Sequence, residues 1–173
     1  MANKRTRKEN KTSRLRSRQN PASDKRIPKV LGVLVLLLSV YLFVAFVSYL
    51  FTWKTDQDQV FNFSWSLFFD ETLSVENWLG RFGAITSHAF FYWSVGLPSF
   101  IAIFVLTKLG YLLLVGKSLK AMWSPIQYTL TFLLYFSPLL AFLFKGTTFS
   151  WGGAFGNYIS AWLVQFVGTI GTA

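Results

Sequence analysis

Residues 30–51 read VLGVLVLLLSVYLFVAFVSYLF, a run of 22 uncharged residues dominated by leucine, valine, phenylalanine and tyrosine. The hydrocarbon core of a bilayer is about 30 Å thick, and an α-helix needs about 20 apolar residues to cross it. Secretory signals have shorter apolar cores of about 7–15 residues, followed by a small-residue cleavage site that this sequence lacks. The run therefore predicts a retained transmembrane helix at about residues 30–52.

The segment in front of this helix, residues 1–29, is strongly basic. It carries eleven of the chain's 17 lysines and arginines, whereas Glu9 and Asp24 are its only acids. Because it has few large apolar residues, we expect it to be a disordered tail, and its charge predicts a cytoplasmic location. The tail residues assigned to topology and to contact with anionic lipid are Arg14, Arg16, Arg18, Lys25, Arg26 and Lys29. Weak contact with DNA phosphates is the alternative, although the tail has no aromatic residue for base stacking.

The remaining hydropathy pattern predicts two more crossings. The segment 54–81 holds five of the seven acids, as expected for a loop outside the cytoplasm. A helix at about 74–86 is expected to lie on the outer interface, and spans are expected at about 89–115 and 122–144. Cysteine is absent, so the fold has no disulfide and no thiolate metal site.

Lysines and prolines refine this arrangement. Lys108 is expected to snorkel toward the inner headgroups, and Lys117 and Lys120 to form a short basic cytoplasmic turn. Pro98 and Pro138 fall inside the second and third predicted spans, where each removes a backbone hydrogen bond and favours a kink.

The last segment, residues 146–173, has no charge but contains six glycines, which makes a continuous span a poor assignment. Its large apolar residues recur at helical spacing, with Asn157, Ser160, Ala161 and Gln165 on the other face. A second amphipathic interfacial helix is therefore expected at about 153–170. The predicted fold class is an all-α, polytopic membrane helical bundle in which residues 30–173 form the membrane domain.

Two glycine pairs mark the interfacial helices. The string Trp78-Leu-Gly80-Arg-Phe-Gly83 precedes a predicted span, and Phe166-Val-Gly168-Thr-Ile-Gly171 is similar to it. This repeat predicts a fourth span directly after Ala173, so we expect the sequence to be the front part of a longer chain. Close helix packing explains the glycines better than a phosphate loop, because no complete loop motif ending in Gly-Lys-Ser or Gly-Lys-Thr occurs.

The sequence offers few groups for chemistry. His88 is the single histidine and has no intramembrane carboxylate to relay protons with, so a structural role is favoured. Asp56 with Asp58, and Asp70 with Glu71, are predicted to be solvated loop acids rather than ligands of a hard cation. No catalytic triad or nucleophile elbow is present. We therefore expect no active site, no metal site and no cofactor.

Residues 75–84 (VENWLGRFGA), residues 152–158 (GGAFGNY) and residues 168–172 (GTIGT) together resemble the N-terminal membrane domain of the FtsK/SpoIIIE family of bacterial DNA translocases. The resemblance implies four spans after a basic tail, a linker and a hexameric ATPase motor. Neither linker nor motor lies within these residues, so we expect no ATP hydrolysis and no DNA translocation from them. DNA would then be contacted only through the missing motor or weakly through the tail.

The resemblance also implies a role in cell division and chromosome segregation. It predicts a multi-pass protein of the bacterial inner membrane at the division septum, with division-machinery membrane proteins as partners and homo-oligomers formed through the full-length protein. The residues assigned to packing and partner contact are Trp78, Gly80, Gly83, Gly153, Gly156, Gly168 and Gly171.

Two other functions stay open from the sequence. A small transporter or channel component would need polar groups facing a cavity, and the spans offer only a few, namely Ser94, Ser99, Thr107, Thr129, Thr131 and Ser137. A stand-alone membrane scaffold has the same sequence signature as an anchor.

Overall fold

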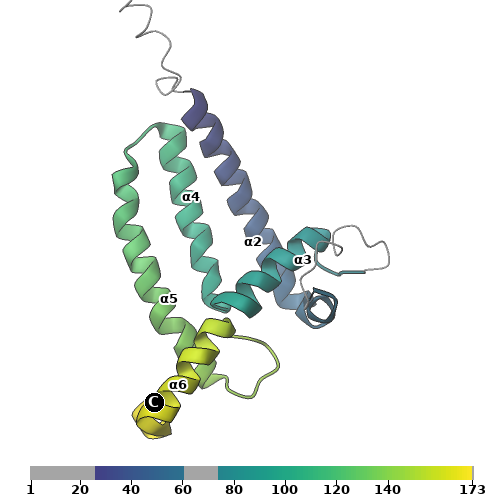
Figure 1. The fold of residues 1–173 in the computed structure, drawn as a ribbon. Coiled ribbons are helices and arrows are strands. Elements are labelled where there is room, and N and C mark those ends of the chain that lie inside the picture. The colour runs from purple at the N-terminus through teal and green to yellow at the C-terminus, as the bar shows by residue number, and fades with distance from the viewer. Residues whose placement is uncertain (1–25, 61–73, 173) are drawn as a thin grey trace, which may run out of the picture.

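The structure is a computed structural model that describes residues 26–60 and 74–172. All regular elements in these ranges are helical, which confirms the all-α prediction. The long helices are α2 (Arg26–Val60), α4 (Phe100–Val115) and α5 (Trp123–Leu143). Two further helices, α3 (Gly80–His88) and α6 (Gly153–Thr172), lie at one end of the molecule (Figure 1).

Three helical segments within the described ranges are long and apolar enough to cross a membrane: Arg26–Val60, Leu97–Val115 and Leu119–Leu143. They run side by side with α4 between α2 and α5 (Figure 1). Helices α2 and α4 approach closely at Gly32, where an added Cβ would lie 2.8 Å from the Gly110 carbonyl oxygen. Small residues at such crossings allow the backbones of membrane helices to touch. The predicted membrane bundle is thus confirmed.

The first helix is longer than its predicted span of 30–52. It continues to Val60, so Asp56 and Asp58 lie on a helix and not in a loop. No glycine or proline interrupts the sequence from Val33 to Val60, so nothing local stops the helix at the expected membrane boundary. Residues 26–29, predicted as the end of the basic tail, form the first turn of α2, whereas residues 1–25 and the acids Asp70 and Glu71 lie outside the described residues.

The second predicted span and its interfacial helix have different boundaries in the structure. Residues 74–79 are not helical, and α3 continues as a π-helix, Ala89–Ser94, through the positions where the span was expected to begin. The chain then turns at Gly96, whose φ of 75° favours glycine, and the membrane-length segment starts at Leu97. Pro98 therefore lies in the first turn of this segment, where proline is well accommodated, and does not kink its interior.

The third predicted span, 122–144, corresponds closely to α5. A short 3₁₀ turn, Leu119–Met122, leads into this helix, and Pro138 lies inside it as expected. The predicted interfacial helix at 153–170 corresponds to α6, which is interrupted by a non-helical residue, Gly168.

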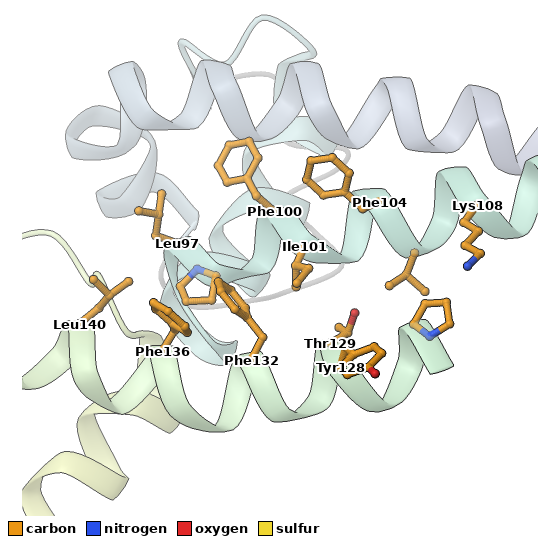
Figure 2. A pocket seen from close by; sticks show the side chains of 13 residues that line it. Leu97, Phe100, Ile101, Phe104, Lys108, Tyr128, Thr129, Phe132, Phe136 and Leu140 are labelled. Atoms are coloured by element: carbon orange, nitrogen blue, oxygen red, sulfur yellow. The ribbon is translucent and has the colours of Figure 1, made fainter. Parts of the chain in front are cut away.

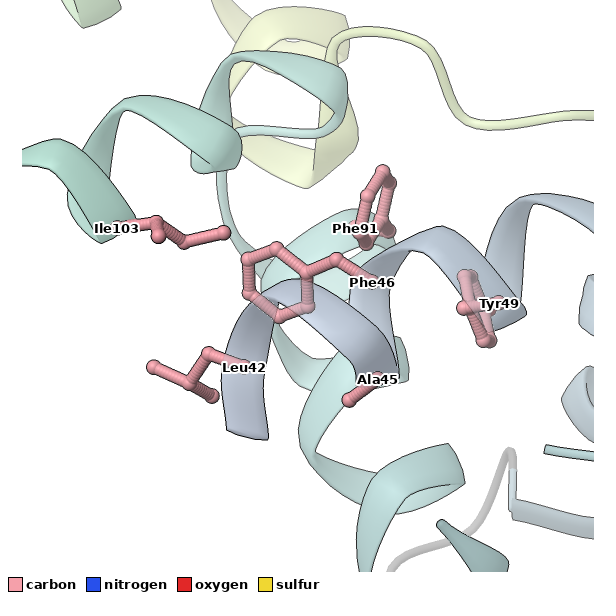
Figure 3. Close-up of a cluster of buried hydrophobic side chains, with 6 residues drawn as sticks. All are labelled: Leu42, Ala45, Phe46, Tyr49, Phe91 and Ile103. Carbon is pink, nitrogen blue, oxygen red and sulfur yellow. The ribbon is translucent and has the colours of Figure 1, made fainter. Parts of the chain in front are cut away.

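The buried core lies where α2, the π-helix and α4 meet (Figure 3). Phe46 of α2 is fully buried, and its ring lies 5.2 Å from that of Phe91 at 84° and 5.5 Å from that of Phe100 at 80°. These edge-to-face arrangements suit the aromatic quadrupole. Since the three rings come from three helical segments, they fix the angle at which the π-helix meets the two long helices.

Candidate assembly site

The C-terminal end of α2 holds residues 76–79 through buried polar groups. The Asp56 carboxylate accepts a hydrogen bond from the Thr52 hydroxyl at 2.5 Å, and its other oxygen accepts one from the Glu76 backbone N–H at 2.7 Å. Asp56 is fully buried, whereas Asp58 is exposed. The prediction that Asp56 is a solvated loop acid is therefore wrong, because tertiary contacts enclose it.

Asn77 and Ser48 extend this connection. The Asn77 side-chain amide donates to the Ala45 carbonyl at 3.1 Å, and its oxygen accepts from the Leu79 N–H at 3.1 Å. The Trp78 N–H donates to the Ser48 hydroxyl at 2.8 Å. Sequence reasoning missed Ser48 and Asn77, because a serine in an apolar run and an asparagine in a loop become informative only once α2 and residues 77–78 are in contact.

His88 is the last residue of α3, and its side chain is buried. Its Nδ1 lies 2.9 Å from the Tyr49 hydroxyl, and its ring stacks on Tyr92 with 4.9 Å between centroids. Burial lowers the pKa of His88 to about 4, so the imidazole is neutral near pH 7 and shares one hydrogen bond with the Tyr49 hydroxyl. These contacts support the structural role favoured by the sequence.

A glycine crossing joins the first half of the fold to the second. The Leu97 N–H donates to the Trp151 carbonyl at 2.8 Å. An added Cβ at Gly96 would lie 2.5 Å from the Trp151 carbonyl carbon, and one at Gly153 would lie 2.5 Å from the Gly96 nitrogen. Real Cβ atoms do not tolerate such separations, so both positions require glycine for close approach as well as for their positive φ.

A second contact holds α6 on α5. The Ser137 hydroxyl donates to the Gly152 carbonyl at 2.6 Å, and a Cβ on Gly156 would lie 2.7 Å from the Ser137 Oγ. Ser160 continues the buried side of α6, whereas Asn157 and Gln165 are exposed. The sequence prediction had grouped Ser160 with these exposed residues, and the structure instead places it on the packing side.

The predicted packing glycines fall into two groups. Close contacts surround Gly83, Gly153 and Gly156, and at Gly83 an added Cβ would lie 3.2 Å from the Asn77 Cγ. In contrast, Gly80 and Gly168 have positive φ values of 65° and 79° and face open space. Gly171 has only Val167 of its own helix nearby, at 3.1 Å.

The other predicted residues lie on the surface or beyond the described ranges. Trp78 is 65% exposed, and its ring stacks on Phe51 with 6.5 Å between centroids. Arg26 and Lys29 are exposed in the first turns of α2. Arg14, Arg16, Arg18 and Lys25 lie outside the residues that the structure describes.

The structure also corrects the predicted repeat. Trp78-Leu-Gly80-Arg-Phe-Gly83 corresponds to Trp151-Gly-Gly153-Ala-Phe-Gly156, because each string opens a short helix on a glycine with φ of 65° or 66°. Gly168 corresponds instead to Gly96, since each breaks the helical path with a positive φ. Both strings match the pattern W-x-G-x-F-G, which is visible in the sequence. We infer that residues 78–83 and 151–156 are two copies of one motif.

The comparisons with known proteins identify the region. The family model described as the 4TM region of DNA translocase FtsK/SpoIIIE matches residues 24–173. Neither the comparison with curated proteins nor that with solved structures gave a match.

Proposed function

This chain belongs to the FtsK/SpoIIIE family of DNA translocases through its membrane region, and on that premise we propose that it anchors a translocase in the bacterial inner membrane at the division septum. The proposed role is placement and assembly in cell division and chromosome segregation. It requires neither a catalytic residue nor a cofactor within these residues. Contact with DNA is assigned to a motor outside them or, weakly, to the basic tail.

The observation that carries the anchoring role is the bundle of three membrane-length helices, which has a net positive charge at one end only. Arg26 and Lys29 at the start of α2 and Lys117 and Lys120 between α4 and α5 make this end basic, whereas at the other end Asp56, Asp58 and Glu76 are balanced by Lys54, Arg81 and Lys145. Lysine and arginine are enriched on the cytoplasmic side of membrane proteins. This asymmetry supports a cytoplasmic basic end and an outer end that carries α3 and α6.

The outer end also offers a surface for partners. Exposed aromatic residues gather on the two short helices, with Trp78 and Phe82 beside α3 and Tyr158, Trp162 and Phe166 on α6. The Trp162 and Phe166 rings stack with 5.2 Å between centroids. Clustered tryptophan and tyrosine are typical of interface hot spots, and we assign this surface to membrane proteins of the division machinery.

A localisation experiment tests this assignment. A fluorescent fusion of the native protein carrying W162A and F166A should stay in the membrane but lose its enrichment at the septum. The control Y135A removes an aromatic residue that is 65% exposed but belongs to α5 and not to the two outer helices, and it should leave the enrichment intact. Unchanged septal enrichment of the double variant would refute the partner surface on α6.

The size of the native product separates an anchor from a stand-alone scaffold. An antibody against the basic tail should detect a band several times larger than 19.8 kDa in membranes of the source cell if a motor follows. A band near 19.8 kDa would favour the scaffold.

The transporter alternative gains no support from the polar residues of the spans. The hydroxyls of Thr107 and Thr131 bond to carbonyls of their own helices, at 2.8 and 3.0 Å. Ser99 and Ser137 bond to carbonyls of neighbouring segments, at 2.9 and 2.6 Å. All four hydroxyls are therefore bonded to the protein's own backbone carbonyls. Solute-dependent flux in reconstituted vesicles would reverse this judgement.

A further inference from the structure

A groove of about 630 Å³ lies between α4 and α5 (Figure 2). Its walls are almost entirely apolar, with Leu97, Phe100 and Phe104 on one side and Phe132, Phe136 and Leu140 on the other. Phe104 is 74% exposed, so the groove is open toward the surroundings of the bundle. In a membrane, those surroundings are lipid.

The polar lining is concentrated toward one end of the groove. Lys108 extends from α4 toward α5, and the Tyr128 and Thr129 hydroxyls lie on the facing part of α5 (Figure 2). This is the end nearer the basic turn that contains Lys117 and Lys120. The acids of the described residues, Asp56, Asp58 and Glu76, are at the opposite end of the bundle. A lysine beside an apolar groove within a span favours an anionic partner. Because the three carboxylates are at the other end, they do not provide this partner for Lys108.

The length of the groove suits one lipid chain. Leu97 and Lys108 are 11 residues apart on one helical segment, or about 16 Å at 1.5 Å per residue. Half of a 30 Å hydrocarbon core is about 15 Å, the depth reached by one lipid chain. An acyl chain that follows the groove therefore places its headgroup near Lys108.

We propose that this groove binds an anionic phospholipid, with one acyl chain along the aromatic walls and the headgroup phosphate on the Lys108 ammonium. The Tyr128 and Thr129 hydroxyls are additional donors at the phosphate end. The lipid would also fill the space that keeps α4 and α5 apart over the length of the groove.

The direct test counts lipids that remain bound. Residues 1–173 are reconstituted in nanodiscs with equal amounts of phosphatidylglycerol and phosphatidylcholine, extracted in mild detergent and weighed by native mass spectrometry. One phosphatidylglycerol should be retained per chain. K108Q should lower this retention about tenfold, as expected for loss of one charge-assisted contact, and K108R should preserve it. The matched control K117Q should retain lipid, because the Lys117 amine lies over the Tyr111 ring, at 5.7 Å, and does not line the groove.

A second variant tests the groove separately from the charge. T129W fills the groove while keeping Lys108, and it should also lose the bound lipid, with helical circular dichroism unchanged. Equal retention of both lipids, or unchanged retention in K108Q and T129W, would overturn the proposal. A lipid-free dimer that K108Q or T129W converts to a monomer would overturn it as well, since a second copy would then occupy the groove.

Discussion

Gly80 and Gly153 open helices α3 and α6 with nearly identical positive φ angles, 65° and 66°. Their surroundings differ, because Gly80 faces open space and Gly153 lies against the backbone of Ser94 and Gly96. At Gly80 the motif therefore forms only a turn, whereas at Gly153 it forms a turn and also a close contact with another backbone segment.

This difference predicts unequal costs of substitution. G80A should destabilise the fold by about 1–2 kcal/mol, the cost of a left-handed conformation for an L-residue. G153A should cost about 1–3 kcal/mol more, because its methyl group also overlaps the neighbouring backbone. Thermal unfolding in detergent, followed by tryptophan fluorescence, measures both. Equal losses would show that the crossing at Gly153 does not limit stability.

Substitutions of Asp56 and Asp58 should differ in their effect on stability. D56A leaves the buried Thr52 hydroxyl and the Glu76 N–H without their acceptor and should cost about 1–3 kcal/mol. D58A changes the same charge two residues away at an exposed position and should be nearly neutral. Similar unfolding temperatures for the two variants would contradict the assigned role of Asp56.

His88 predicts a dependence of stability on pH. Its pKa in the folded protein is lowered to about 4 from an ordinary value of 6.5. Between these values the unfolded chain binds a proton that the folded chain excludes, so stability should decrease as the pH falls from 6.5 to 4. Unfolding temperatures across this range measure the effect. H88Q should show a smaller decrease, and an identical slope would exclude His88 as the cause.

The Ser137 hydroxyl should contribute to holding α6 on α5. S137A removes the hydrogen bond to the Gly152 carbonyl and should cost about 1 kcal/mol, with α6 loosened on α5. Limited proteolysis between residues 145 and 152 should become faster. T131A is the control, since its hydroxyl bonds only within its own helix at an exposed site. Equal proteolysis of the two variants would argue against this contact as the main attachment of α6.

Hydropathy alone predicted three membrane-length helices and their order, because crossing a bilayer depends on about 20 consecutive residues. It placed α5 well, since Lys120 and Lys145 lie just beyond its two ends. It placed the start of the second span too early, because residues 89–94 are as apolar as those that follow Gly96. Hydropathy cannot distinguish the helical segment 80–94 from the span that follows it, because only a turn at Gly96 separates the two.

The candidate site was recovered in part. Glycines such as Gly83 and Gly156 are recognisable as packing residues because few other functions explain them in an apolar sequence. Asp56, Asn77 and Ser48 were not, since hydrogen bonds between α2 and residues 76–79 connect positions 20 or more residues apart. Local patterns determined which segments are apolar and where the backbone breaks. Only the tertiary structure decided that Gly96 meets Gly153 and that Asp56 is enclosed, because those contacts depend on how separate helices approach each other.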